Sequence, residues 1–248
     1  MKLLIDIGNS RIKWAYANAS LLSGVGSATY QWPFAHSWWA NALPLGDVPD
    51  QVIIASVAGA ELNTSLEQWL ADTWTVERVF LASAACSLGV TNAYREPEKL
   101  GVDRWAAMLA AHAQVRGAVC VVDCGTAVTL DIVNAAGVHQ GGMILPGRYM
   151  MRQALHARTS RIPLTDAVEQ HSLLGTDTDS CISAAGLQAT LGMIERAQRQ
   201  YTQETGEAAV CVLTGGDAKV YLKHLSPECR HEPDLVLKGI HLLSEEHR

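Results

Sequence analysis

The sequence predicts an α/β fold with mixed sheets, assembled from two similar halves. Short apolar runs alternate along the chain with segments whose apolar residues recur three or four positions apart. A pattern of strand, turn and second strand occurs twice, at a spacing close to half the chain. The 248 residues, 48% hydrophobic and 18% charged, suffice for one large domain or two closely associated halves with a substantial core. We place the two halves at residues 1–115 and 116–248.

Strands are predicted where short apolar runs indicate burial on both faces of a sheet. These runs are residues 2–7, 12–17, 51–57, 76–81, 118–124, 128–133 and 208–214. Helices are predicted where apolar residues recur with helical spacing. These segments are residues 60–72, 102–115, 148–157, 179–205 and 234–245.

The charge balance argues against a nucleic-acid partner. The chain has 19 Lys and Arg residues against 25 Asp and Glu residues, so the basic stripe of a nucleic-acid binder is missing. The six cysteines include no CxxC pair, which predicts reduced core residues in a cytoplasmic protein. No apolar run approaches the ~20 residues of a membrane helix, and the nine histidines lack the spacing of a metal site.

The two copies of the repeated pattern are LLIDIGNSRIKWAY and VVDCGTAVTLDIV. Both have an apolar strand, an Asp, one further residue, a Gly, hydroxyl or amide residues, and a second strand. Asp6 and Gly8 fill this plan in the first copy, and Asp123 and Gly125 fill it in the second. Each copy alone also fits an ordinary hairpin turn. Two copies at half-chain spacing favour two similar halves that face each other across a cleft.

Such a turn suits phosphate binding. Glycine allows the backbone to turn tightly and approach a ligand, so that successive N–H groups can point at phosphate oxygens. Asn9, Ser10 and Thr126 add side-chain donors, while the strand-end Asp can hold a metal ion or its bound water. A third element, VCVLTGGDAK, places Gly215 and Gly216 after a strand and suits close approach of a ring or ribose, although an ordinary strand-to-helix turn has the same pattern. The P-loop, Rossmann and HExxH motifs are missing from the sequence, so ATP binding would rest on the paired Asp-x-Gly loops.

Five strings, in one order along most of the chain, carry a resemblance to a known family: DIGNSRIKW, PEKLGVDRW, VVDCGTAVTLDIV, GGMILPG and LTGGDA. Together they resemble the type III pantothenate kinases, members of the acetate and sugar kinase/actin-like superfamily. The resemblance implies two duplicated ribonuclease H-like halves whose mixed sheets flank a nucleotide cleft. It also implies ATP-dependent phosphorylation of pantothenate to 4'-phosphopantothenate, the first step of coenzyme A biosynthesis. A homodimer with its substrate pocket near the subunit interface is implied as well.

The same resemblance assigns residues to ATP and its cations. The first loop corresponds to the ATP-phosphate segment, with Ser10 where the family often has Thr, and Thr126 would be a second ATP contact. Asp123 matches the position that binds an activating monovalent cation, K+ or NH4+. Asp6 would hold Mg2+ through water. The loop comprises Asp6, Ile7, Gly8, Asn9, Ser10, Arg11, Ile12 and Lys13.

For the second substrate, the string GVDR corresponds to the pantothenate-binding segment. Asp103 would be the catalytic acceptor of the proton from the primary hydroxyl. Tyr94 matches a further substrate contact, and Thr178 matches a later one, with the nearby Thr176 as the alternative. The segment comprises Gly101, Val102, Asp103 and Arg104.

The residues themselves agree with this assignment. Helical spacing places Asp103 in the first turn of a helix, where backbone donors keep its carboxylate ionised and make it a weak base. Phosphoryl transfer tolerates a weak base because alignment and charge neutralisation dominate its transition state. Arg104 can pair with a carboxylate or with developing phosphate charge. Without the other motifs, the two residues would be interpreted as a helix-capping Asp beside a surface Arg.

Other features have two interpretations. The aromatic residues at 32–39 could form a binding platform, but core or interface packing is the favoured alternative. Four arginines between 148 and 161, Arg152 among them, could attract an anionic substrate or form a solvated helix face. The apolar helix over residues 181–197 could be an interface or a core helix.

The alternative functions are a kinase of the same superfamily that acts on another small hydroxyl or carboxylate compound, and a non-catalytic actin-like regulator that depends on nucleotide.

Overall fold

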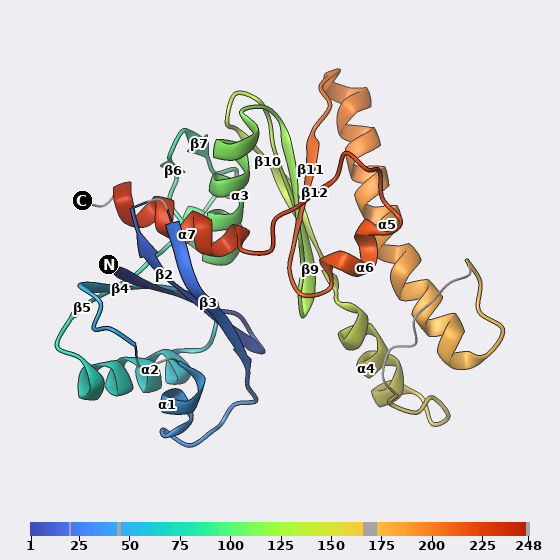
Figure 1. The fold of residues 1–248 in the computed structure, drawn as a ribbon. Coiled ribbons are helices and arrows are strands. Elements are labelled where there is room, and N and C mark those ends of the chain that lie inside the picture. Colours follow the sequence, from blue (N-terminus) through green and yellow to red (C-terminus); the bar gives the residue numbers. More distant parts are fainter. Residues whose placement is uncertain (20, 44–45, 166–172, 247–248) are drawn as a thin grey trace. The chain divides into compact units, whose positions relative to one another are not determined.

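The computed structural model describes residues 1–19, 21–43, 46–165 and 173–246 and divides into two compact units (Figure 1). The first unit contains Met1–Ala113 and Asp234–Arg248, and the second contains Gln114–Pro233. Each unit has its own five-stranded mixed sheet, which confirms the predicted α/β class. The boundary between residues 115 and 116 stays a prediction, and the structure groups the last helix with the first unit.

The sheet of the first unit has the strand order β3-β2-β1-β4-β5. β1 pairs antiparallel with β2 and parallel with β4, so a hairpin is followed by a crossover connection. β3 continues the hairpin antiparallel, and β5 adds parallel to β4. The bounds are β1 Lys2–Ile7, β2 Arg11–Asn18, β3 Leu21–Thr29, β4 Gln51–Ser56 and β5 Glu77–Phe80.

Two helices, α1 (Trp38–Ala42) and α2 (Ala60–Thr73), cover one face of this sheet (Figure 1). Alternate residues of β1 point to this face and pack against both helices, as the two-residue period of a strand requires. Phe34 and Trp38 extend the same layer, with ring centroids 4.4 Å apart. Trp39 is fully buried there and stacks on Trp69. Core packing is therefore confirmed for Phe34, Trp38 and Trp39, whereas Trp32 is exposed.

The C-terminal helix α7 (Leu235–Glu246) contacts β1, β2 and β4 on the opposite face. It also packs against α3 (Val102–Val115), where a Cβ added at Gly239 would lie 1.9 Å from the carbonyl oxygen of Ala106. Lys2 on β1 donates to the carbonyl oxygen of Ser244 at 2.7 Å and pairs with Glu245. Shorter elements precede α3: β6 Cys86–Ser87, β7 Val90–Thr91 and the 3-10 helix η1 Pro97–Lys99.

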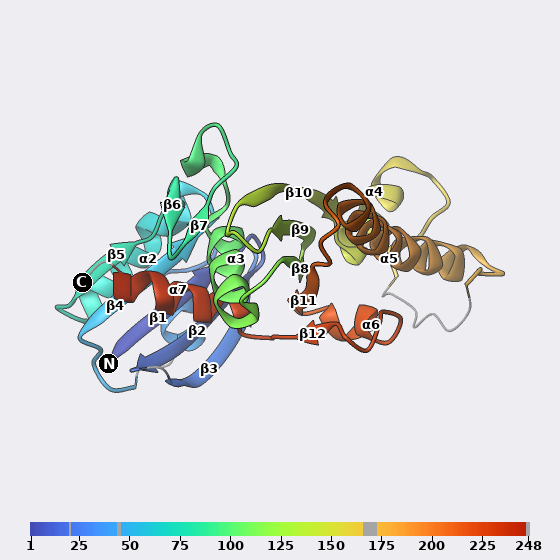
Figure 2. The same cartoon turned by 90° about the horizontal axis from the view of Figure 1, so that it is seen from above.

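The second sheet repeats the arrangement of the first, with the order β10-β9-β8-β11-β12 (Figure 2). β8 pairs antiparallel with β9 and parallel with β11, as β1 does with β2 and β4. The internal repeat predicted from the sequence is therefore a structural repeat. The bounds are β8 Val119–Cys124, β9 Ala127–Val133, β10 His139–Pro146, α4 Arg148–Arg158, α5 Thr178–Thr205, β11 Val210–Thr214, α6 Ala218–Leu222 and β12 Arg230–His231.

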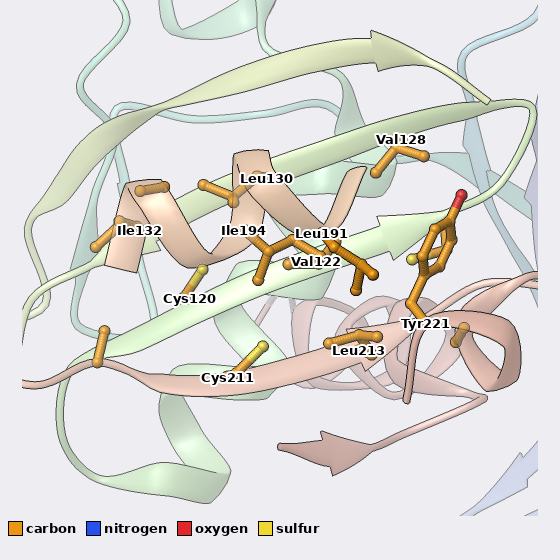
Figure 3. Close-up of a cluster of buried hydrophobic side chains, with 14 of the residues drawn as sticks. Cys120, Val122, Val128, Leu130, Ile132, Leu191, Ile194, Cys211, Leu213 and Tyr221 are labelled. Carbon is orange, nitrogen blue, oxygen red and sulfur yellow. The ribbon is translucent and has the colours of Figure 1, made fainter. Parts of the chain in front are cut away.

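The core of the second unit lies where the sheet meets α5 and α6 (Figure 3). Leu191 and Ile194 of α5 pack on buried residues of β8, β9 and β11, so this apolar helix is a core helix. Cys120 and Cys211 are paired in register on β8 and β11, and none of the six cysteines forms a disulfide. Cys120, Cys124 and Cys211 are buried, whereas the prediction of a core position is wrong for Cys86 and Cys181, which are exposed. The hydrogen bond with Cys120, together with burial, raises the pKa of the Cys211 thiol. In the described part of the chain, none of the helices has the length and apolarity that a membrane span requires.

The edge strands β3, β10 and β12 were not predicted, nor were the two-residue strands β6 and β7. β3 exposes most of its side chains and contains Gly24 and Gly26, and β10 exposes Met143 and Ile144. Because edge strands are covered less completely than central ones, they carry no continuous apolar run that sequence analysis could detect. The short helices α1 and α6 were missed as well, because five residues give too little periodicity.

The close packing of α7 on α3 can be tested with Gly239→Ala. The added methyl group has no room, so we expect the free energy of unfolding to fall by about 1–3 kcal/mol, the usual cost of overpacking. Gly192→Ala on α5 is the matched control, because a Cβ at Gly192 meets nothing within 4 Å. That control should gain stability, since Ala favours helices over Gly by about 1 kcal/mol. Urea unfolding followed by far-UV circular dichroism measures both, and equal stabilities would contradict the described packing.

Candidate functional site

The turn between β1 and β2 is the first part of the candidate site. The strand register ends with Ile7 opposite Ile12, and residues 8–11 form the turn. The Gly8 amide donates to the carbonyl oxygen of Arg11 at 3.0 Å, and a Cβ at Gly8 would lie 3.3 Å from that oxygen. The Gly8 N–H therefore closes the turn instead of facing a phosphate, which differs from the expectation for this amide.

The other residues of the loop differ in exposure. Ile7 and Ile12 are fully buried in the core of the first unit, so a ligand contact at these positions would use the backbone. Asp6 and Lys13 are cross-strand partners and place opposite charges side by side on the sheet. Asn9 and Arg11 are exposed, while Asp6, Gly8, Ser10 and Lys13 are half-buried.

The GVDR segment forms the first turn of α3. The Trp105 amide donates to the carbonyl oxygen of Gly101 at 3.0 Å, and Asp103 Oδ1 accepts from the Arg104 amide at 2.8 Å. A Cβ at Gly101 would lie 2.5 Å from Asp103 Oδ1. Only a glycine at position 101 therefore leaves room for the carboxylate in this position. The helix dipole favours the ionised form of a carboxylate at this end. Val102 is buried and supports the turn from the core side.

Val57 connects this turn to the end of β1. Its amide donates to the carbonyl oxygen of Ile7 at 3.0 Å, and its Cγ1 lies 3.6 Å from the place of a Gly101 Cβ. The structure therefore brings the predicted phosphate loop and the Asp103 segment to the same edge of the first sheet.

Tyr94 and Arg104 contact each other directly. Arg104 Nη1 donates to the Tyr94 hydroxyl oxygen at 2.9 Å, and the guanidinium carbon lies 5.7 Å from the centroid of the Tyr94 ring. Arg104 is only 8% exposed. The alternative of a surface arginine is therefore wrong, although Asp103 does accept a backbone hydrogen bond at the helix start, as a capping Asp would.

Asn92 holds the Tyr94 segment and was missed by the sequence analysis. Its Nδ2 donates to the carbonyl oxygens of Ala84 and Pro97, each at 3.2 Å. Its Oδ1 accepts from the Tyr94 amide at 3.0 Å. A turn-forming Asn two residues before Tyr94 was the available signal, but such residues are common in loops.

The turn between β8 and β9 has the same construction with one residue fewer. Residues 125–127 form the turn, and the Gly125 amide donates to the carbonyl oxygen of Ala127 at 3.1 Å. Gly215, at φ 90°, packs on the end of β8, where a Cβ would lie 2.4 Å from Asp123 Oδ1 and 2.5 Å from the Cys124 carbonyl oxygen. Only a glycine fits this position, and its close approach is to the protein's own strand.

Thr126 is held from the end of the neighbouring hairpin. Its carbonyl oxygen accepts from the Gly147 amide at 2.9 Å, directly before α4. A Cβ at Gly147 would lie 2.5 Å from the carbonyl oxygens of both Gly125 and Thr126. The last glycine of the string GGMILPG is therefore required by contact with this turn.

The surroundings of Asp123 can be tested for a cation. Within the described ranges, no three His, Cys, Asp or Glu side chains are grouped so that they could hold a metal ion. Asp123 instead offers one carboxylate near backbone carbonyl oxygens, and its cross-strand partner Thr129 adds no charge. Carboxylate and carbonyl oxygens are the donors that hard cations prefer. Burial, Asp123 and Asp217 together raise the pKa of the Cys124 thiol, so a second carboxylate lies near this strand end. A cation here would take its further ligands from water or a nucleotide.

Thr178 is exposed at the first position of α5. Asp177 caps this helix, because its side chain accepts from the Ser180 amide at 2.9 Å. Hydrogen bonds with the backbone and side chain of Ser180 lower the pKa of Asp177. The Thr176 amide donates to Ser180 Oγ at 3.1 Å, and this threonine is exposed too. Both candidate threonines therefore lie at the α5 N-terminus.

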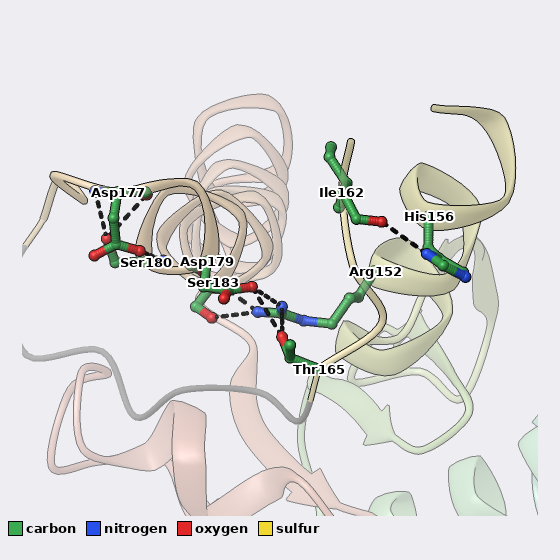
Figure 4. A network of polar contacts seen from close by, with 8 residues as sticks. All are labelled: Arg152, His156, Ile162, Thr165, Asp177, Asp179, Ser180 and Ser183. Carbon is green, nitrogen blue, oxygen red and sulfur yellow. Dashed lines mark hydrogen bonds and ion pairs between the residues drawn. The ribbon is translucent and has the colours of Figure 1, made fainter. Parts of the chain in front are cut away.

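Arg152 of α4 is 2% exposed and forms a polar network with α5 (Figure 4). It donates to Thr165 Oγ1 and Asp179 Oδ1, both at 2.6 Å, and to Ser183 Oγ at 2.9 Å. Hydrogen bonds from Thr165 and Arg152 lower the pKa of Asp179. The interpretation of a solvated helix face is therefore wrong for Arg152, which fixes α4 against the start of α5 next to Thr178.

Comparisons with known proteins agree with the sequence motifs. A family model described as Type III pantothenate kinase matches residues 2–200. A protein of that name from Nitrosococcus oceani is 38% identical, over 97% of this chain and 92% of its own length. Another from Dichelobacter nodosus is 36% identical, over 97% of this chain and 96% of its own length.

Solved structures show the fold at lower identity. A Baf family transcriptional activator from Campylobacter jejuni has a TM-score of 0.62 at 19% identity, covering 99% of this chain and 98% of that one. Component A of (R)-2-hydroxyglutaryl-CoA dehydratase from Acidaminococcus fermentans has a TM-score of 0.53 at 12% identity, covering 100% and 99%.

The network around Arg152 predicts a dependence of stability on pH. Because the pKa of Asp179 is lowered, its ionised carboxylate stabilises the fold above the ordinary Asp pKa of about 4, and this contribution is lost as the pH falls through the lowered value. The stability deficit of Asp179→Asn should therefore shrink as the pH falls from about 6 to 3. Glu195→Gln, at an exposed position of α5, is the control for charge removal. A deficit that stays constant over this range in urea unfolding would refute the role of the carboxylate.

Proposed function

We propose residue roles from the premise that this chain belongs to the type III pantothenate kinase family, whose model matches residues 2–200. The protein transfers a phosphoryl group from ATP to pantothenate, the first step of coenzyme A biosynthesis. The observation that carries the proposal is the placement of Asp103. Its carboxylate lies in the first turn of α3, beside the end of β1 where the Gly8 turn begins.

Residues 6–13 and Thr126 are proposed to contact ATP. Asn9, Ser10 and Thr126 carry side-chain donors at the two glycine turns, and Lys13 adds a positive charge that phosphate oxygens attract. The turns are closed by their own glycine amides, which restricts the loop shapes before a ligand binds. A preformed loop does not lose conformational freedom when the nucleotide binds.

Asp6 and Asp123 are the proposed cation-binding carboxylates. Asp6 would hold Mg2+ through water, and Asp123 would hold K+ or NH4+. When bound, these cations supply positive charge that offsets the charge of the phosphates. The protein's own part is to keep both carboxylates at the ends of central strands, at equivalent places in the two sheets.

Asp103 is the proposed catalytic base, and its neighbours are proposed to hold pantothenate. Its carboxylate lies in the first turn of α3, where it can accept the hydroxyl proton and orient the oxygen for attack. Arg104 presents a permanent positive charge that suits the pantothenate carboxylate or developing phosphate charge, and Tyr94 fixes its guanidinium group. Gly101 and Val102 complete the binding segment through the backbone.

Thr178 is proposed as a further substrate contact, in a homodimer of this chain. The exposed apolar residues of β10 and α4 support such an assembly, because a monomer rarely exposes several large apolar residues on adjoining elements. They are Met143, Ile144, Tyr149, Met150 and Leu155.

A cytoplasmic location is proposed as well, and the six free cysteines support it, since thiols stay reduced there.

Asp103→Asn tests the catalytic base. The amide oxygen can still accept from the Arg104 amide, so the turn should stay intact while the basicity is lost. We expect kcat to fall at least about 100-fold, with the KM for ATP and the melting temperature unchanged. Glu98→Gln, an exposed acid just before the GVDR turn, should keep wild-type kinetics. A near wild-type kcat in Asp103→Asn would sink the assignment.

Asp123→Asn tests the cation site. The wild-type enzyme should lose activity when K+ is replaced by Na+, whereas the variant should have low activity in both salts, because its neutral amide binds a cation weakly. Initial rates at matched ionic strength give, for each enzyme, the ratio of its activity in K+ to its activity in Na+. A variant that keeps the wild-type K+/Na+ ratio would show that Asp123 does not hold the ion.

A further inference from the structure

Tyr30 follows β3 directly and contacts the β1–β2 turn twice. Its amide donates to the carbonyl oxygen of Ser10 at 3.0 Å. Its hydroxyl group donates to the carbonyl oxygen of Gly8. Together with the bond from the Gly8 amide to Arg11, these contacts engage both backbone groups of Gly8. One residue, directly after the third strand, thus contacts the turn at Ser10 through its backbone and at Gly8 through its side chain.

The second unit repeats the backbone contact without the side chain. Gly147 also follows the third strand of its sheet, and its amide donates to the carbonyl oxygen of Thr126 in the β8–β9 turn at 2.9 Å. No side chain fits there, because a Cβ would lie 2.5 Å from two carbonyl oxygens. The longer turn of the first unit leaves room for a side chain, and Tyr30 uses this room to reach Gly8.

The surroundings of Tyr30 favour a fixed hydroxyl donor. Its ring makes edge contacts with Phe34 and Trp38, at centroid distances of 5.9 and 6.1 Å. Burial raises the pKa of Tyr30, so the hydroxyl group stays protonated and can donate throughout the neutral pH range. The aromatic residues of the first unit therefore fix the position of the Tyr30 ring, and the hydroxyl group on this ring contacts the turn.

We propose that Tyr30 is a positioning residue for nucleotide binding: its hydroxyl group holds the backbone of residues 8–10 in the shape that receives the phosphates of ATP. The inference rests on the proposed assignment of this loop to ATP. Without the hydroxyl group, the turn is held by backbone bonds alone and populates other shapes. Nucleotide binding must then select the competent shape, which weakens the apparent affinity.

Tyr30→Phe tests this role, since it keeps the ring and removes one oxygen atom. The KM for ATP and the Kd of ADP with Mg2+, measured by calorimetry, should each rise about threefold to tenfold, the range that one hydrogen bond supports. The KM for pantothenate and kcat should stay unchanged. Tyr201→Phe is the matched control, because it removes a hydroxyl donor that contacts Glu207 in the second unit. Unchanged nucleotide affinity in Tyr30→Phe would overturn the proposal, as would an equal rise in both variants.

A merely structural role is separated by amide hydrogen exchange. In the absence of nucleotide, the Gly8 amide should exchange faster in Tyr30→Phe than in the wild type, and Tyr201→Phe should leave its rate unchanged. Equal Gly8 exchange in Tyr30→Phe and wild type would contradict the proposed hold on the turn.

Ser10→Ala separates this inference from the loop assignment on which it rests. If Ser10→Ala raises the KM for ATP and Tyr30→Phe does not, the role of Tyr30 is overturned while the assignment stands. If neither variant changes the KM for ATP, the loop does not bind ATP, and both the loop assignment and the role of Tyr30 are overturned. If Tyr30 acts by positioning the loop, the double variant should lose less affinity than the product of the two single effects.

Discussion

Both sheets depend on the same constraint, the closure of the turn that joins their first two strands. In each unit a glycine amide closes the turn, and the residue after the third strand donates its amide to a carbonyl oxygen of that turn. This contact ties three strands together at one end and leaves the strand-end Asp in the same place in both sheets. Gly147 is required because a Cβ there would collide with the second turn, and Gly215 because a Cβ there would collide with the end of β8 that leads into this turn.

The two copies have diverged in charge. Asp6 lies opposite the basic Lys13 in the register of its hairpin, whereas Asp123 lies opposite the neutral Thr129. In the proposed kinase, this difference suits a phosphate loop with water-bridged Mg2+ in the first unit and a directly bound monovalent ion in the second. The duplicated frame therefore carries two different sets of side chains.

The sequence predicted the central strands, the long helices and the repeat, because these segments have continuous apolar runs or helical spacing. It placed Asp6, Asp103 and Asp123 at element ends, since strings such as DIGNS and GVDR combine a polar group with a glycine. It missed Tyr30 and the pairing of Arg152 with Asp179, which act across segments distant in sequence. It also missed Asn92, whose contacts are local but lie in a loop, where such residues are common. Such contacts depend on the edge strands and loops, whose weak patterns left them unpredicted.

The fold alone is shared with a protein described as a transcriptional activator, so the fold does not separate a kinase from a regulator. Asp103, held beside the Gly8 turn by Gly101 and Val57, is the feature that a nucleotide switch would not need. The most direct measurement is ADP release from MgATP with pantothenate as the sole acceptor, with the product identified by mass spectrometry. The account predicts release that depends on pantothenate, with a product heavier by one phosphoryl group. Nucleotide binding without turnover on pantothenate would contradict it.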